Sequence, residues 1–314
     1  MTVDNMRHER TILVLFVCIT LLIGILLGVF IQKNLGFGNV LRSFGVPYPT
    51  AAPPLQGPPV VEIPQEHRGR MLLFILAGQS NMVGWAPVPD DQISDPRVYV
   101  FGNNYQWWIA REPVDDAHNQ VDIVSQDRIA GFGPSLAFGL ASVERNPEVV
   151  IGLIPCAKSS SGIIEWQRNL SDQSLYGSCL KRARAASPMG QISGVLFFQG
   201  ETDALDPNLF PQFDPHPSTW SVLFSDFITA VRRDLDDPEL PVVFAQLGAN
   251  PDPADVPYWE LIKEQQASIQ LPMTGMIITE DLPLLDGLHF TTDSYRIIGN
   301  RFADAYWDLI AQQR

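Results

Sequence analysis

The chain has 314 residues, of which 46% are hydrophobic and 18% are charged, and its formal net charge at pH 7 is −14. This length allows one large domain or two ordinary ones, with enough apolar residues for a substantial core. The excess of negative charge repels nucleic acids and anionic lipid headgroups, which excludes both as main partners and favours a neutral or weakly charged substrate.

The N-terminal segment has the length and polarity of a membrane anchor. Residues 12–31 contain no charged side chain, and a helix of that length spans about 30 Å, the hydrocarbon thickness of a bilayer. The run is longer than that of a typical cleaved signal peptide, and no small-residue cleavage site follows it. We therefore predict a short tail over residues 1–11 and a transmembrane signal-anchor over 12–32.

This anchor sets the expected location of the rest of the chain. A short tail before a long downstream domain favours a single-pass membrane protein whose domain is lumenal or extracellular, and cleavage of the segment would yield a secreted protein instead. Residues 46–64 carry seven prolines, which is typical of an extended spacer. We predict a Pro-rich linker over residues 33–66 and a globular domain over 67–314.

Short apolar runs alternate with helix-length amphipathic stretches along this domain. The apolar runs are nearly continuous, as strands covered on both faces require, and they predict strands at 71–77, 149–154, 192–198, 241–248 and 274–279. Helices are predicted near 134–145, 176–187, 218–236, 257–270 and 293–311. Alternation of this kind predicts an α/β fold, with a central parallel sheet covered by helices on both faces.

Polar side chains follow several of these predicted strands. Gly78, Gln79, Ser80 and Asn81 come after the first strand, and Gln199, Gly200 and Glu201 come after the third. In doubly covered parallel sheets, ligands bind beyond the carboxyl ends of the strands. These segments are therefore expected to meet at one site.

The pair Asp286 and His289 stands in the loop before the last predicted helix. A spacing of three lets the carboxylate hold one imidazole nitrogen while the other faces outward, as in a Ser-His-Asp arrangement. A serine hydroxyl needs such a base to become a nucleophile. We predict Ser80 as the nucleophile, His289 as the base and Asp286 as the residue that orients the base.

Attack by a serine on an ester creates an oxyanion, which needs hydrogen-bond donors. The backbone N–H of Ser80 is one candidate donor. Gly133, at a predicted helix start, and the side-chain amide of Gln199 are the others. Gln79 and Asn81 are expected to support the site, and Glu201 either orients neighbouring loops or serves as a buried structural carboxylate.

The three cysteines form no metal-binding motif, and neither a metal ion nor a cofactor is predicted. Cys18 lies in the predicted anchor. Cys156 and Cys179 either pair, if the domain faces an oxidising compartment, or remain two free core thiols.

The motifs "GQSNM", "FGP", "QGETD" and "DGLHFT" resemble, in order and spacing, the blocks of the SGNH hydrolase superfamily. The variant is similar to the sialate O-acetylesterase-like branch, carbohydrate esterase family six, which includes plant acetylxylan-esterase-like proteins. The resemblance covers roughly residues 71–305. It implies a three-layer α/β/α sandwich, no metal, and removal of acetyl groups from sugar hydroxyls through an acyl-enzyme intermediate.

The sequence departs from that branch at three positions. Ser159-Ser160 stands where a Gly-Gly pair is common, Phe198 replaces a usual Tyr, and Thr202 replaces a usual Ser. None of these changes removes a catalytic group, and the first bears on the shape of the substrate pocket.

Two other functions are compatible with these motifs. One is an O-acetyl transferase acting on glycans, which would use the same nucleophile. The other is a non-catalytic glycan-binding module that uses exposed aromatic residues, for which Trp107, Trp108, Trp166 and Trp220 are the candidates.

Overall fold

The computed structural model describes residues 57–249 and 256–312. The predicted tail, the transmembrane signal-anchor over 12–32 and most of the predicted linker lie outside these residues. In the part that is described, no helix combines the length and the apolarity needed to cross a bilayer.

The compact unit begins at Gly57, ten residues before the predicted start of the domain. The side chain of Ile63 is 3% exposed, and the backbone N–H of Val61 donates to the carbonyl oxygen of Trp107 at 2.8 Å. Within this Pro-rich stretch, an apolar side chain is therefore buried and a backbone amide is hydrogen-bonded. Residues 57–66, the last ten of the predicted linker, belong to the folded unit.

Within the described residues, seven strands form one sheet in the order β3-β2-β4-β1-β5-β6-β7. The strands are β1 Met71–Gly78, β2 Val98–Phe101, β3 Trp107–Ile109, β4 Val150–Pro155, β5 Gly190–Phe198, β6 Val242–Ala245 and β7 Thr274–Ile277. All neighbouring pairs are parallel except β2 and β3. The five predicted strands are confirmed, whereas β2 and β3 were not predicted and the antiparallel β3 makes the sheet mixed.

The helices are α3 Ser80–Val83, α4 Ser135–Arg145, α5 Leu175–Ala186, α6 Trp220–Asp234, α7 Trp259–Ala267 and α8 Thr292–Gln312. Short 3-10 helices occur at η2 Ile123–Ser125, η3 Ile163–Trp166, η4 Ser187–Met189, η5 Thr202–Ala204 and η6 Pro211–Phe213. Each of the five longer helices lies where the amphipathic pattern predicts one. In α8, Tyr295, Ile298, Phe302 and Tyr306 form the buried face, at the spacing of one side of a helix.

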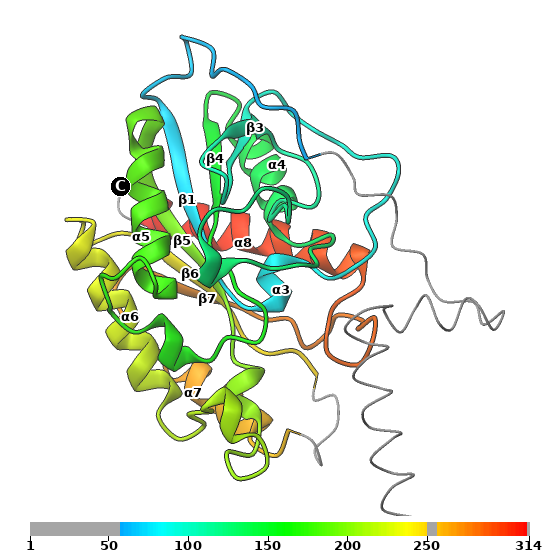
Figure 1. Ribbon diagram of the computed structural model, residues 1–314, viewed down its shortest axis with the longest axis vertical. Coiled ribbons are helices and arrows are strands. Elements are labelled where there is room, and N and C mark those ends of the chain that lie inside the picture. Colours follow the sequence, from blue (N-terminus) through cyan, green and yellow to red (C-terminus); the bar gives the residue numbers. More distant parts are fainter. Residues whose placement is uncertain (1–56, 250–255, 313–314) are drawn as a thin grey trace, which may run out of the picture. The chain divides into compact units, whose positions relative to one another are not determined.

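The helices cover the sheet on both faces, which is the predicted three-layer arrangement (Figure 1). On one face, α5, α6 and α7 pack on an aromatic cluster in which the rings of Phe197 and Phe224 are 4.8 Å apart. On the other face, α4 and α8 pack on Phe74, whose ring lies 4.7 Å from Phe138 and 4.8 Å from Tyr306. The central strand β1 is therefore fully enclosed, and its carboxyl end is held in a fixed position.

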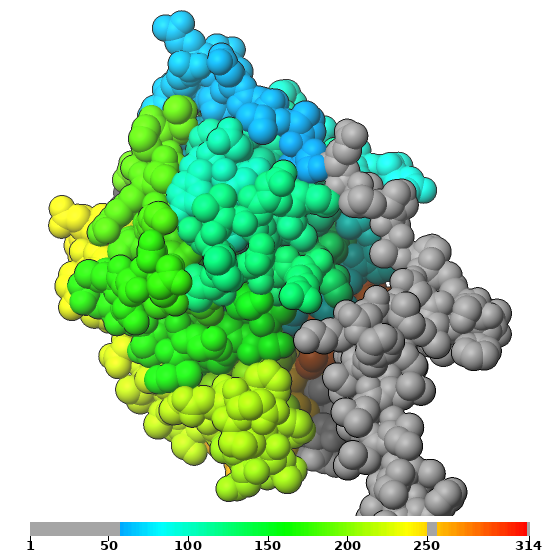
Figure 2. Space-filling view, viewed as in Figure 1, coloured from blue at the N-terminus to red at the C-terminus, as the bar shows by residue number. Residues whose placement is uncertain are grey.

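The segment between β3 and α4 packs against α5, and Figure 2 shows the two regions in contact on one face of the molecule. Arg182 of α5 is 1% exposed. Its guanidinium donates to Asp122 at 2.9 Å and to the carbonyl oxygen of Pro155. A buried charge needs a partner of this kind, so Arg182 fixes the end of β4 as well as the segment around Asp122.

Cys156 and Cys179 form a disulfide that joins the residue after β4 to α5. This outcome settles the alternative between pairing and free thiols that the sequence leaves open.

Removal of this disulfide by Cys179→Ala is expected to lower the free energy of unfolding by about 3 kcal/mol, because the bond closes a loop between residues 23 positions apart. Urea denaturation followed by tryptophan fluorescence measures the change. Addition of a reductant should destabilise the wild-type protein by a similar amount and leave Cys179→Ala unaffected. A wild-type protein insensitive to reductant under denaturing conditions would contradict this expectation.

Candidate active site

The first predicted residue, Ser80, lies at the carboxyl end of the central strand. β1 ends at Gly78, and Ser80 is the first residue of α3. Gly78 has a φ of +131°, and a Cβ atom at this position would lie 2.1 Å from the carbonyl oxygen of Phe198. Glycine is therefore required where the chain leaves the sheet and turns into the short helix. The turn places Ser80 at the edge where ligands of parallel sheets bind.

The other two predicted catalytic side chains lie beside Ser80. The Nε2 atom of His289 is 2.9 Å from the Oγ atom of Ser80, and its Nδ1 atom is 2.8 Å from the Oδ2 atom of Asp286. The other carboxylate oxygen, Oδ1, accepts hydrogen bonds from the backbone N–H groups of His289 and Leu288 at 2.8 and 3.1 Å. The carboxylate, imidazole and hydroxyl thus form one hydrogen-bonded line.

The charge of Asp286 fixes the proton arrangement along this line. Partial burial raises the pKa of its carboxyl group, but hydrogen bonds from the backbone and ring of His289 and from the Leu288 amide outweigh burial and hold the pKa below its ordinary value. An ionised carboxylate only accepts hydrogen bonds, so Nδ1 of His289 carries the proton and Nε2 accepts from the hydroxyl of Ser80. The ring of Trp85 stacks on the imidazole at 4.5 Å and limits its rotation.

A cavity of about 210 Å³ opens over these side chains. Its lining comprises Gln79, Ser80, Trp85, Ser159, Ser160, Glu201, Thr202, Leu205, Phe213, Val256, Leu288 and His289. Apolar side chains form one part of the wall and hydrogen-bonding groups form another. Such a cavity accepts a small group with an apolar end and a polar end.

Two of the predicted supporting residues, Asn81 and Glu201, connect the segments that make up the site. The Nδ2 atom of Asn81 donates to Oε1 of Glu201 at 2.5 Å, and its Oδ1 atom accepts from the hydroxyl of Tyr295 at 2.6 Å. Burial raises the pKa of Glu201 although the Asn81 bond lowers it. The Oε2 atom of Glu201 has no hydrogen-bond partner among the described residues, and this side chain lines the cavity.

The structure does not place Gln199 as an oxyanion donor. Its side chain is fully buried and does not line the cavity. The Nε2 atom donates to Oδ2 of Asp203 at 2.6 Å, to the carbonyl oxygen of Ser161 at 3.1 Å and to Oε1 of Gln79 at 3.2 Å. In this arrangement the amide nitrogen of Gln199 faces buried acceptors, and its role as an oxyanion donor stays a prediction.

Gly133 is not placed as an oxyanion donor either. It lies before α4, where its Cα atom packs against Gly84 at the end of α3, and it does not line the cavity. Its backbone amide lowers the pKa of the Glu112 carboxyl group. The glycine lies at a helix start as predicted, and its role as an oxyanion donor stays a prediction.

The cavity also presents polar groups other than these predicted donors. The Oε1 atom of Gln79 accepts from the backbone N–H of Thr202 at 3.3 Å and from Nε2 of Gln199. This pairing fixes the orientation of the Gln79 amide and leaves its Nε2 donor for a molecule in the cavity. The loop after β4 also lines the cavity, and Ser160 there has a φ of +62°.

The loop after β4 is held in place by a charged pair. The carboxylate of Asp127 accepts from Nζ of Lys158 at 3.0 Å and from the backbone N–H of Ser159 at 2.8 Å. Ser160 adopts a left-handed conformation, which glycine accommodates more readily than serine. The Ser159-Ser160 pair that the sequence singles out therefore lies in the cavity wall.

The tryptophans considered for glycan binding do not form a binding surface. Trp108, Trp166 and Trp220 are at most 1% exposed and belong to the core, and Trp107 packs against Phe101 at 4.9 Å. The burial of Trp108, Trp166 and Trp220 argues against these three candidates of the glycan-binding alternative. Trp85, which the sequence analysis did not single out, is the tryptophan that lines the cavity.

In residues 57–249 and 256–312, no cluster of three or more His, Cys, Asp and Glu side chains is arranged to hold a metal ion. The other histidines of this part of the chain, His67, His118 and His216, do not line the cavity.

Comparison with known proteins places this geometry in context. Residues 70–308 match the family model described as carbohydrate esterase, sialic acid-specific acetylesterase. A probable carbohydrate esterase of Arabidopsis thaliana is 28% identical over 253 residues, which cover 74% of this chain and 89% of the Arabidopsis protein.

Solved structures share the fold. The X-ray structure of that Arabidopsis protein aligns with a TM-score of 0.64 and covers 76% of this chain and 99% of its own. The crystal structure of NanS has 17% identity and a TM-score of 0.59, with coverage of 79% and 99%. A carbohydrate acetylesterase from Xanthomonas citri has 19% identity and a TM-score of 0.56, with coverage of 76% and 56%.

Proposed function

The chain belongs to the carbohydrate esterase family of sialic acid-specific acetylesterases, and from this membership we propose that it is a serine esterase that removes acetyl groups from sugar hydroxyls. The observation that carries the proposal is the line from Asp286 through His289 to Ser80 in the wall of a small cavity. The size of the cavity and its apolar wall suit a short acyl group.

The proposed reaction transfers the acetyl group twice, first from the sugar to Ser80 and then from Ser80 to water. Nε2 of His289 takes the hydroxyl proton of Ser80 as Oγ bonds to the acetyl carbonyl carbon. The resulting tetrahedral intermediate expels the sugar oxygen, which receives the proton from His289, and acetyl-Ser80 remains. Water activated by His289 then attacks this ester, acetate leaves, and Ser80 regains its proton.

The oxyanion of each tetrahedral intermediate requires donors that face the cavity. The backbone N–H of Ser80 is suitable because the first amide of a helix has no intrahelical acceptor. We assign Nε2 of Gln79 and the backbone N–H of Ser160 as the further donors. Gln79 is oriented by Thr202 and Gln199, and the amide of neighbouring Ser159 is already bonded to Asp127.

The substrate class is tested by measuring acetate release from O-acetylated sialic acid and from acetylated xylan oligosaccharides, with p-nitrophenyl acetate and p-nitrophenyl octanoate as references. We expect the acetyl sugars and the acetyl reference to be hydrolysed and the octanoate to react poorly. Hydrolysis of both p-nitrophenyl esters without acetate release from any sugar would contradict the proposal. Addition of an unacetylated sugar acceptor distinguishes hydrolysis from acetyl transfer.

Asp286→Asn is expected to lower kcat for p-nitrophenyl acetate by roughly 10²- to 10⁴-fold, because an amide neither fixes the Nδ1–H tautomer of His289 nor stabilises the imidazolium. Steady-state kinetics measure the loss. Asp293→Asn, a change of the same kind at an exposed residue of α8, is the control. A decrease confined to KM would contradict the assigned role.

We also propose that the N-terminal segment anchors the enzyme in a membrane, with the esterase domain in an oxidising compartment. The charge-free run of residues 12–31 supports the anchor, and the Cys156–Cys179 disulfide supports the compartment. Resistance of the membrane-bound full chain to extraction by sodium carbonate tests the anchor. Recovery in the soluble fraction would count against it.

A further inference from the structure

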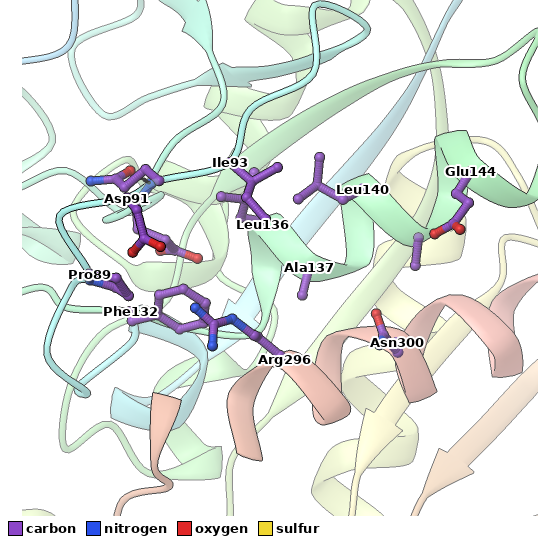
Figure 3. Close-up of a pocket in the computed structure, with 13 residues that line it drawn as sticks. Pro89, Asp91, Ile93, Phe132, Leu136, Ala137, Leu140, Glu144, Arg296 and Asn300 are labelled. Atoms are coloured by element: carbon purple, nitrogen blue, oxygen red, sulfur yellow. Dashed lines mark hydrogen bonds between the residues drawn. The ribbon is translucent and has the colours of Figure 1, made fainter. Parts of the chain in front are cut away.

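A second cavity, of about 180 Å³, lies between α4, α8 and the segment around residues 89–93 (Figure 3). It shares no lining residue with the cavity at Ser80. Its walls are mainly apolar and include Ile93, Phe132, Leu136, Ala137 and Leu140. In Figure 3, α4 contributes Leu136, Ala137 and Leu140, while α8 contributes Arg296 and Asn300. The cavity thus offers an apolar chamber separate from the proposed chemistry.

The charged side chains of this cavity favour a cation. Asp91, Glu112 and Glu144 contribute carboxylates, whereas Arg296 is the cationic residue in the lining. The guanidinium of Arg296 donates to Asp293 at 2.7 Å and lies over the ring of Phe132 at 5.1 Å. The three acidic side chains outnumber the single guanidinium, so the lining is net negative when Glu112 is ionised.

Glu112 supplies a buried acceptor at this cavity. The residue is 2% exposed, and its Oε2 atom accepts from the backbone N–H of Val114 at 3.2 Å. Its Oε1 atom has no hydrogen-bond partner among the described residues. Buried polar atoms are rarely left unpaired, because a buried acceptor that loses water without gaining a donor is unfavourable. A donor from a bound molecule would satisfy this acceptor.

We propose that this cavity binds a small amphiphilic ammonium compound, with its apolar body against α4 and its ammonium group hydrogen-bonded to Oε1 of Glu112. The apolar walls account for the body, and the buried acceptor and the surrounding carboxylates account for the charge. This inference does not depend on the proposed esterase activity.

The protonation of Glu112 gives the proposal a measurable signature. Burial raises the pKa of its carboxyl group to about 8, although the amides of Val114 and Gly133 and the charge of Arg296 lower it. Asp91 and Glu144 line the same cavity, and Tyr295 of α8 also senses the charge of Glu112. Below pH 8 the ammonium must displace a proton, so its affinity should rise by up to about tenfold per pH unit and level off above pH 8.

The probe is hexylammonium, titrated into the full-length protein in detergent by calorimetry at pH 6.5 and 8.5, with titration into empty micelles subtracted. Hexanol and hexanoate are the matched neutral and anionic probes. We expect saturable binding of hexylammonium that is tighter at pH 8.5, and at least tenfold weaker binding of the other two. Equal binding of hexanol, or no saturable binding of hexylammonium, would overturn the proposal.

Two variants locate the binding. Ala141→Trp adds a ring to α4 at the cavity wall and should abolish binding, while Val222→Trp on the exposed side of α6 should leave it unchanged. Glu112→Gln should remove both the preference for ammonium and the pH dependence. Circular dichroism and thermal unfolding report folding of each variant, and binding that survives in folded Ala141→Trp would place the ligand elsewhere and refute the site.

Discussion

Ser80→Ala is expected to lower kcat for p-nitrophenyl acetate by a factor on the order of 10⁴ to 10⁶, because the substitution removes the atom that forms the proposed acyl-enzyme. His289→Ala should cause a comparable loss, since Oγ of Ser80 then has no base within hydrogen-bond distance. The double variant should be no worse than either single variant. Groups that act in one step do not contribute additively.

The measurement is the initial rate of p-nitrophenol release, together with mass spectrometry of the rapidly quenched protein. Wild-type enzyme should show a transient increase in mass of one acetyl group on the peptide that contains Ser80. Ser268→Ala, which removes an exposed hydroxyl at the end of α7, is the matched control and should retain full activity. Full activity in Ser80→Ala would refute the proposed mechanism.

Gly78→Ala is expected to lower the free energy of unfolding by about 3 kcal/mol or more. The residue has a φ of +131°, and an added Cβ atom would lie 2.1 Å from the carbonyl oxygen of Phe198 and 2.7 Å from its carbonyl carbon. Both neighbours belong to the backbone of β5, so no side-chain rotation relieves the overlap. β1 or β5 must shift, and they are adjacent strands in the middle of the sheet.

Gly69→Ala separates the two causes of this loss. Gly69 also has a positive φ, +72°, but nothing lies within 4 Å of an added Cβ atom. Its substitution should therefore cost only the backbone penalty, about 1 kcal/mol. Urea denaturation of the two variants gives the comparison. Equal destabilisation would show that the contact with Phe198 is not the dominant cost.

The sequence predicted the long elements because their patterns are sustained. Five apolar runs became β1, β4, β5, β6 and β7, since burial on both faces requires continuous apolar strands. β2 and β3 escaped prediction because each is short, at four and three residues. The two adjacent tryptophans of β3 suggested a ligand surface, whereas tertiary packing buries Trp108 in the core.

The hydrogen-bonded line from Asp286 through His289 to Ser80 was predictable for a different reason. Asp286 and His289 are three residues apart, and Ser80 follows a strand, so local spacing and a general rule for parallel sheets sufficed. The oxyanion donors depend on which strands are neighbours. β4 lies beside β1, which brings Ser159 and Ser160 to the cavity, and the sequence does not contain that strand order. Gly133 and Gln199 were therefore assigned without knowledge of which strands are neighbours.

The proposed nucleophile and the proposed base are 209 positions apart in the chain. A ribosome must complete nearly the whole domain, and α8 must dock, before the first proton can move from Ser80. By the proposed mechanism, the nascent chain therefore has no esterase activity during its synthesis. Proteolytic fragments that lack either the β1 region or the segment before α8 would likewise be inert, so any cut that separates the two also switches the enzyme off.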